Sequence, residues 1–395
     1  MMRVPLAYNI RSIFVRRSSS LLTIFGIAVT VAVVAGVLAL QQGFSTLYAD
    51  NGREDLAVFL RPGATNEGDS MFSRQRGLNM IKSLPEIAQN ESGQPLASLE
   101  CYLAVRRFKA GGGETNVPVR GVQPMTFELR GDEVKIIQID GEEKSRNFAP
   151  GSDEVIVGKR LLGRIRGCDI GDVITFNTTP FRVVGAFESE GPFESEIWGD
   201  MDRILTALER QAPNRVLAKL REDTDIEQLG AFLEKHKEFP AKVETERLYL
   251  GKQTQMLSAI LIMLSKFLGV IMGTAAVFTA TNTMLSALAS RTHEIGILLA
   301  SGFGPVPIFL SFLLESLILC LMGGLVGCVL ALGVNGIETS TTNFQTFTEV
   351  VFAFRVTPSV LWTAVCFSLA LGLIAGALPA WRAARLSPTE ALRRR

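Results

Sequence analysis

The residues with the clearest chemical pattern lie in a short stretch, residues 290–302, between two long apolar segments. The pattern consists of Arg291, Glu294, Ile295, Gly296 and Ile297. It is charged at its start and apolar after that, as in a short helical loop. A membrane protein without an ATP site of its own can be driven by a partner protein that binds a loop of this kind between two spans.

One carboxylate falls inside an apolar run. Glu315 lies eight residues past Pro307, which is about 12 Å into a helix that rises 1.5 Å per residue. An ionisable residue in a membrane span needs a partner or a function. Two interpretations stay open: Glu315 contacts the loop at residues 290–302, or it is protonated or bonded to its own helix. Lys266 is predicted at the other side of the membrane and is no partner for it.

Most catalytic constellations are excluded by composition. The chain has only His236 and His293, so it offers neither a His-based metal cluster nor a Ser–His–Asp arrangement. No G-x-x-x-x-G-K-[ST] phosphate loop occurs. The net charge of +1 gives no sign of nucleic-acid binding. We therefore expect no enzyme activity, metal or cofactor in this chain, and no nucleic-acid partner.

The elements that position the loop are four apolar runs, each long enough to cross a bilayer, which takes about 20 residues. The predicted spans are residues 21–41, 256–288, 307–334 and 359–381. Residues 42–255, between the first two spans, form a polar block large enough for a proper core. The fold class is a membrane protein with four transmembrane helices and a large α+β extracytoplasmic domain inserted between helices 1 and 2.

Orientation follows from the basic residues near the ends. Arginines are concentrated before the first span and after the last, and such flanks stay in the cytoplasm. Both termini are therefore predicted inside, with an amphipathic helix at residues 1–20 and a tail at 382–395. Residues 289–306 form a cytoplasmic loop and 335–358 an external one. The first span is too long for a signal-peptide core and is expected to remain as an anchor.

Within the external block, apolar runs predict strands and helical periodicity predicts short helices. Two subdomains are expected, the inner one at about residues 110–195. Cys101 and Cys168 either form a disulfide or remain buried thiols, and both readings stay open. No obvious helix breaker occurs from Thr245 to Leu288, so the second span is expected to continue outside the membrane as a stalk. The alternative is a kink at Gly251.

Small residues recur at four-residue spacing in the spans, which lets helix backbones approach closely. The glycines concerned are Gly269, Gly273, Gly323, Gly327, Gly372 and Gly376. The spans also lack chains of ionisable residues, which an ion-coupled transporter would be expected to show. A tightly packed bundle is therefore predicted, without a wide hydrophilic pore.

Two motifs carry a family resemblance. Residues 291–298, RTHEIGIL, and residues 379–392, PAWRAARLSPTEAL, are similar to the loop and the closing motif of MacB-like (type VII, FtsX/LolC-like) permeases of ABC transporters. The run EVIVGKRL at 154–161 resembles part of that family's external domain. His293 stands where the family usually has arginine, so the loop is less basic here.

The resemblance implies a dimer of this permease, with a second copy or a paralogue, bound to separate ABC ATPase subunits that hold ATP and Mg. The loop would dock on the ATPase, and the second span would move the external domain by mechanotransmission in the inner (cell) membrane. The expected function is export or extrusion of a peptide, lipoprotein, lipid or drug. The alternative is an FtsX-like complex that regulates a cell-wall hydrolase. Expected further partners are membrane lipid and a periplasmic adaptor or substrate protein.

Overall fold

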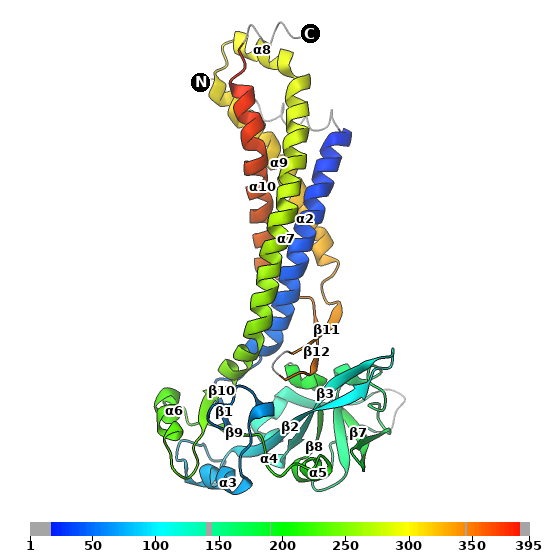
Figure 1. Cartoon of the computed structure of the whole chain (residues 1–395), viewed down its shortest axis with the longest axis vertical. Helices are drawn as coiled ribbons and strands as arrows, with labels where there is room; N and C mark the ends of the chain where they lie inside the picture. The colour runs from blue at the N-terminus through cyan, green and yellow to red at the C-terminus, as the bar shows by residue number, and fades with distance from the viewer. Residues whose placement is uncertain (1–16, 140–143, 190, 344–345, 388–395) are drawn as a thin grey trace. The chain divides into compact units, whose positions relative to one another are not determined.

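A computed structural model describes residues 17–139, 144–189, 191–343 and 346–387 (Figure 1). The chain forms two compact units. The helical unit contains the segments up to Gly43, over Ala259–Ile337 and from Ala353 onward, and the sheet unit contains Phe44–Ser258 and Glu338–Phe352. The predicted amphipathic helix at the N-terminus, as far as residue 16, and the last eight residues of the tail lie outside the described residues.

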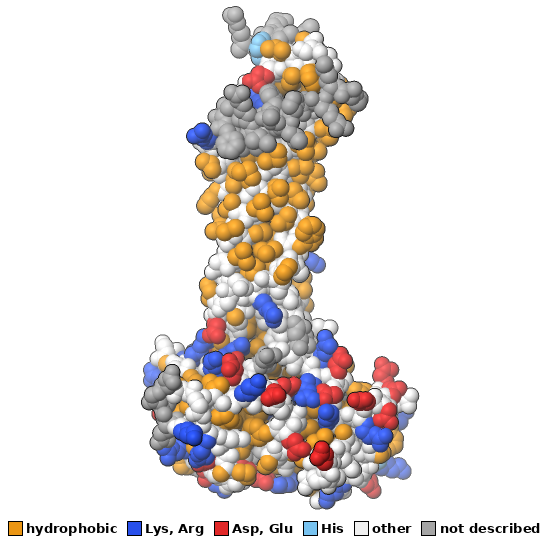
Figure 2. Space-filling view, turned by 180° about the vertical axis from the view of Figure 1, so that it is seen from behind, with side chains coloured by type: hydrophobic (Ala, Val, Ile, Leu, Met, Phe, Trp, Pro, Cys, Tyr) orange, Lys and Arg blue, Asp and Glu red, His pale blue; other side chains and the backbone are white. Residues whose placement is uncertain are grey.

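Within the described part of the chain, four long helices are apolar enough to cross a membrane, in agreement with the sequence. They are α2 (Arg17–Ser45), α7 (Glu246–Ser290), α9 (Pro305–Leu332) and α10 (Pro358–Ala384). Proline at the first position of α9 and of α10 starts each helix without losing a hydrogen bond. In the view of Figure 2, hydrophobic side chains dominate the surface of the long helices, whereas most of the charged side chains lie on the sheet unit.

α7 is one helix of 45 residues and is not interrupted at Gly251. Its residues up to Ser258 belong to the sheet unit and the remainder belongs to the helical unit. At 1.5 Å per residue its length is about 68 Å, more than twice the hydrocarbon thickness of a bilayer, which is about 30 Å. The continuous helix that the expected stalk requires is therefore present.

The sheet unit contains ten strands in one sheet. They are β1 (Leu56–Leu60), β2 (Ala97–Phe108), β3 (Glu114–Val122), β4 (Val134–Ile137), β5 (Glu154–Gly158), β6 (Val173–Phe176), β7 (Thr179–Ser189), β8 (Ile197–Asp200), β9 (Arg215–Lys219) and β10 (Lys242–Thr245). The order is β10-β1-β9-β2-β3-β8-β5-β7-β4, with β6 on β7. Helices α3 (Arg74–Ser83), α4 (Pro124–Arg130), α5 (Met201–Ala207) and α6 (Ile226–Glu234) complete the α+β architecture.

β2 links the two halves of this sheet. Residues 97–100 of β2 pair with β9, and residues 101–108 pair with β3. One apolar core runs along the sheet from Phe59 and Val216 to Val183 and Phe181. Each such fully buried side chain stabilises the fold by roughly 1.5–3 kcal/mol. Cys101 and Cys168 lie in this core as free thiols, and burial raises the pKa of each to about 12.

The segment between α9 and α10, expected as a loop, contains a hairpin of β11 (Glu338–Thr342) and β12 (Glu349–Ala353). This hairpin, up to Phe352, belongs to the sheet unit. Lys109 donates to Glu349 at 2.8 Å, and the hydroxyls of Tyr102 and Thr348 are 3.2 Å apart. The sheet unit is thus built from two separate stretches of chain.

Candidate functional site

The loop at residues 290–302 folds as a short helix, α8 (Thr292–Ala300). Gly302, at φ +93°, ends it with a Schellman motif, in which the Gly302 and Phe303 amides donate to the carbonyls of Leu299 and Leu298. A left-handed conformation of this kind suits glycine, which has no Cβ. The chain then enters α9 at Pro305. Gly302 and Pro305 therefore fix where α8 ends.

One face of α8 is buried within the helical unit. Ile295 is 2% exposed and packs in an apolar cluster with residues of α7, α9 and α10. Members of that cluster include Met284, Leu288, Ile308, Phe312, Ala380 and Ala383. The hydroxyl of Thr292 donates to the carbonyls of Leu288 and Ala289, at 3.1 and 3.0 Å, and Gly296 is buried as well. These residues hold α8 against the ends of the long helices.

A buried ion pair reinforces this attachment. Arg291, at the N-cap position of α8, donates through Nη1 to Glu315 Oε2 of α9 at 3.0 Å. The two side chains are 8% and 6% exposed, and the Arg291 guanidinium lies 5.9 Å from the centre of the Phe312 ring. Glu315 therefore contacts the loop, as one of the two sequence interpretations held. A paired charge avoids the large cost of burying a single one.

The opposite face of α8 is exposed. It presents His293, Glu294, Ile297 and Ala300, which recur at helical spacing. Ile297 is 49% exposed, and the side chain of Glu294 is 57% exposed, at 3.5 Å from Arg291 Nε. The five loop residues singled out from the sequence thus separate into two sets: Arg291, Ile295 and Gly296 are buried, whereas Glu294 and Ile297 are available to a partner. His293 and Ala300 join the exposed set.

The glycines of the spans differ in how closely they are packed. A Cβ added to Gly323 or Gly327 of α9 would lie 2.7–2.8 Å from the nearest atom of α2, and at Gly372 or Gly376 of α10 it would lie 2.9 or 2.6 Å from Cys320 or Ser316 of α9. On α7 the contacts are looser, with 3.1 Å at Gly273 and 3.7 Å at Gly269. The closest helix contacts therefore join α9 to α2 and to α10.

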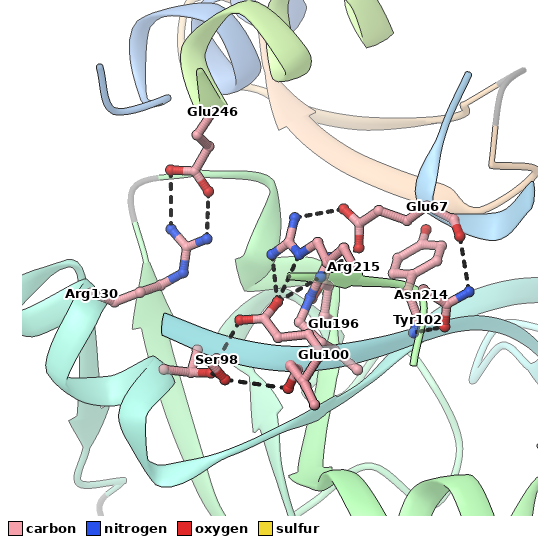
Figure 3. Close-up of polar contacts among 12 residues, drawn as sticks. Glu67, Ser98, Glu100, Tyr102, Arg130, Glu196, Asn214, Arg215 and Glu246 are labelled. Carbon is pink, nitrogen blue, oxygen red and sulfur yellow. Dashed lines mark hydrogen bonds and ion pairs between the residues drawn. The ribbon is translucent and has the colours of Figure 1, made fainter. Parts of the chain in front are cut away.

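A second concentration of charge lies in the sheet unit and was not anticipated from the sequence. Figure 3 shows most of this network, whose carboxyl and guanidinium members are Glu67, Glu100, Arg120, Glu196 and Arg215, on or beside the neighbouring strands β9, β2, β3 and β8. We call these five residues the ion network. All five side chains are at most 6% exposed.

The contacts within the ion network are short and numerous. Arg120 donates two hydrogen bonds to Glu196, at 2.7 and 2.9 Å, and one to Glu67 at 2.6 Å. Arg215 donates to Glu67 at 2.7 Å and to Glu100 at 2.6 and 2.8 Å. Burial alone would raise the pKa of Glu100, but the charges of the nearby arginines lower it to about 2. Glu100 is therefore ionised at neutral pH and holds the strands together.

Among the residues that the structure describes, no group of three or more His, Cys, Asp or Glu side chains is placed to hold a metal ion. The chemistry of both charged centres is instead that of ion pairing and hydrogen bonding. Such contacts fix the position of the elements that carry them.

Comparisons with known proteins agree with this architecture. Residues 20–235 match the model of the MacB-like periplasmic core domain, and residues 266–388 match the FtsX-like permease C-terminal model. Relatives include the macrolide export ATP-binding/permease protein MacB of Vibrio parahaemolyticus, which is 28% identical over 96% of this chain and 58% of its own length. The Agrobacterium fabrum protein of the same name is 27% identical over 97% and 59%. The chain thus spans about three fifths of the length of these relatives.

Among solved structures, the periplasmic region of MacB from Actinobacillus actinomycetemcomitans aligns with 50% of this chain and 92% of its own, at 12% identity and a TM-score of 0.36. The extracellular domain of the transporter YknZ aligns with 48% and 99%, at 15% identity and a TM-score of 0.33. The family models together cover most of the chain, and the first alone covers more than half. The chain therefore belongs to the family of MacB-like and FtsX-like permeases of ABC transporters.

Proposed function

We propose that this chain is the transmembrane subunit of a complex in which a separate ABC ATPase drives movements of the sheet unit outside the cytoplasm. The observation that carries the proposal is the division of α8 into two faces. One face is fixed to α7 and α9 by Ile295 and the Arg291–Glu315 pair. The other presents Glu294 and Ile297 to a partner. Because α8 is attached to the spans in this way, a force that a partner applies to its exposed face is transmitted to the spans.

The orientation that suits this role places α8 and both termini in the cytoplasm. The arginines before α2 and after α10 favour it, because basic residues in short flanks stay inside. The sheet unit then lies outside. ATP and Mg would be held by the ATPase, because residues 1–395 contain no phosphate loop. Relatives of this chain are named ATP-binding/permease proteins. A second permease copy or paralogue would complete the complex.

Export or extrusion of an extracytoplasmic substrate is the activity we favour. Close packing of the spans through glycines favours handling of the substrate outside the bundle. The substrate would then be handled by the sheet unit. Two relatives are named as macrolide exporters, and peptides, lipoproteins and lipids are further candidate substrate classes.

A pair of matched variants tests the docking role of α8. Ile297→Asp places a charge on the exposed face of α8, whereas Ile337→Asp makes the same change at a similarly exposed position, 52% against 49%, beyond the other end of α9. If Ile297 is a contact worth about 2 kcal/mol, Ile297→Asp weakens binding of the ATPase about 30-fold. The measurement is copurified ATPase activity per mole of permease.

The expected result is loss of copurified ATP hydrolysis in Ile297→Asp and retention in Ile337→Asp. Equal retention in both variants would contradict docking through α8. Absence of any ATPase with the wild-type chain would contradict the proposed function itself.

A further inference from the structure

Buried charged side chains fix both ends of α7. At its C-terminal end, Arg291 directly follows the last residue and pairs with Glu315 of α9. At its N-terminal end, Glu246 is the first residue of the helix and has no exposed side-chain surface. Arg130 of α4 donates to both oxygens of Glu246, which Figure 3 shows as a two-pronged contact. A carboxylate in the first turn also suits the positive end of the helix dipole.

Further contacts hold the start of α7 within the sheet unit. The hydroxyl of Tyr249, which is 2% exposed, accepts a hydrogen bond from the backbone amide of Glu67 at 3.0 Å. The backbone amide of Arg53 donates to Glu246 at 3.4 Å. A Cβ on Gly52 would lie 2.5 Å from Cα of Arg247, so the two backbones are in direct contact. The first turn is thus fixed by charge, hydrogen bonding and packing.

These contacts connect α7 to the ion network. The amide of Glu67 bonds Tyr249, while its carboxylate bonds Arg120 and Arg215. Through those two arginines the connection reaches Glu100 on β2 and Glu196 beside β8. A force on the first turn of α7 is therefore transmitted to four neighbouring strands. Short, charge-assisted hydrogen bonds hold these strands together, and such bonds are about twice as strong as neutral ones.

We propose that the Arg130–Glu246 pair, supported by the Tyr249–Glu67 bond, is the joint through which movement of α7 enters the sheet unit. This inference rests on the proposed function, since it names the residues that receive the motion. A bidentate ion pair fixes distance and direction, whereas apolar side chains of the same size can slide and rotate. Replacement of a buried ion pair by apolar residues often leaves stability unchanged or increases it. A mutation of this pair can therefore loosen the attachment of α7 without lowering the free energy of unfolding.

The test is a distance measurement between two spin labels on the full-length chain in lipid nanodiscs. Cys366, the exposed cysteine, is changed to serine, and labels are placed at Ser83→Cys on α3 and Gln255→Cys on α7, both exposed and both in the sheet unit. The intact joint predicts a single narrow distance.

The double variant Arg130→Met with Glu246→Met is expected to lose the narrow distance while the thermal unfolding midpoint stays near that of the parent. Arg130→Lys, which keeps the positive charge but cannot make the two-pronged contact, is expected to broaden the distance in part. The control is Arg203→Met with Asp153→Met, a 2.7 Å pair on the same unit that does not involve α7. That variant should leave the distance unchanged, because it leaves the joint intact.

A narrow distance in the Met pair would overturn the inference, as would equal broadening in the control pair. If the Met pair unfolds, Arg130→Lys decides the question. Partial broadening with an unchanged midpoint would support the joint, and an unchanged narrow distance would contradict a joint that depends on the bidentate contact. Copurified ATP hydrolysis is measured on the same samples. Its absence from the parent protein contradicts the proposed function and the inference together, whereas hydrolysis with a narrow distance in the Met pair contradicts the joint alone.

Discussion

Arg291 pairs with two glutamates, and because one is buried and the other exposed, they should contribute differently to the attachment of α8. Glu315 is buried and lies 3.0 Å from Arg291, whereas Glu294 is mostly exposed and lies 3.5 Å away. Loss of one partner from a buried pair leaves an uncompensated charge, at a cost of about 3–5 kcal/mol in proteins. An exposed pair contributes about 0–1 kcal/mol. The attachment of α8 should therefore depend on Glu315 and hardly on Glu294.

We accordingly predict that Glu315→Gln loosens α8 and that Glu294→Gln does not. Hydrogen exchange of the peptide that covers residues 291–304 measures this directly, because an opened α8 exchanges its amides faster. Equal protection in both variants would show that the apolar contacts of Ile295 suffice without the ion pair.

The ion network makes the sheet unit sensitive to acid. The pKa of Glu100 is about 2 in the folded protein and about 4.3 in an unfolded chain. Its contribution is therefore complete above pH of about 4.3 and is lost as the pH falls through about 2. The difference corresponds to roughly 3 kcal/mol.

We predict that the midpoint of thermal unfolding falls steeply below pH of about 4 in the wild type. Glu100→Gln should be less stable at neutral pH and should show a shallower acid dependence, because this carboxyl no longer takes up a proton. Unfolding followed by circular dichroism from pH 7 to pH 2 checks both. Parallel curves for the two proteins would mean that Glu100 is not the group that titrates.

At the scale of elements, glycine positions that look equivalent in the sequence should respond differently to alanine. A Cβ at Gly323 would lie 2.8 Å from Ile27 and 2.9 Å from the backbone oxygen of Ile24, so α9 and α2 must separate. At Gly269 the nearest atom is 3.7 Å away, which is ordinary contact.

Gly323→Ala is therefore expected to destabilise the helical unit by about 1–3 kcal/mol through overpacking. Gly269→Ala should be neutral or stabilising by up to about 1 kcal/mol, because alanine is the better helix former. Thermal unfolding of the two variants in detergent compares them. A larger loss at Gly269 would mean that α7 has a closer neighbour than the described residues show.

The long helices and most strands could be predicted from sequence because their signals are local. Continuous apolar runs predicted the four spans, and the absence of a breaker before Leu288 predicted the uninterrupted α7. The hairpin of β11 and β12 was missed because Glu338–Thr342, ETSTT, has no apolar residue. Its position depends on partners such as Lys109, 240 residues away in the chain.

The Arg291–Glu315 pair and the ion network differ in how well the sequence alone could predict them. Glu315 stood out because it is a carboxylate inside an apolar run, and its contact with Arg291 spans only 24 residues. The ion network gave no such signal, because Glu67 and Arg215 are 148 residues apart and look like ordinary strand and loop charges. The division of α8 into a buried and an exposed face could have been read from helical spacing, which places Arg291 and Ile295 on one side.

At the scale of the whole molecule, each end of α7 has a distinct role. Its C-terminal end carries α8, which is fixed to the bundle and open on one face, and its N-terminal end enters the sheet unit through Glu246. In the proposed function, one continuous helix between these two fixed ends transmits the movement. The account depends on an ATPase that contacts the open face of α8.

The most direct test places a photo-crosslinking amino acid at position 297, on that face, and separately at position 337, at the other end of α9. Illumination of intact cells, followed by mass spectrometry of the adduct, identifies what each position contacts. The account predicts an adduct at 297 with a chain that contains a G-x-x-x-x-G-K-[ST] phosphate loop, and no such adduct at 337. Failure to capture an ATPase at 297, or equal capture at both positions, would contradict it.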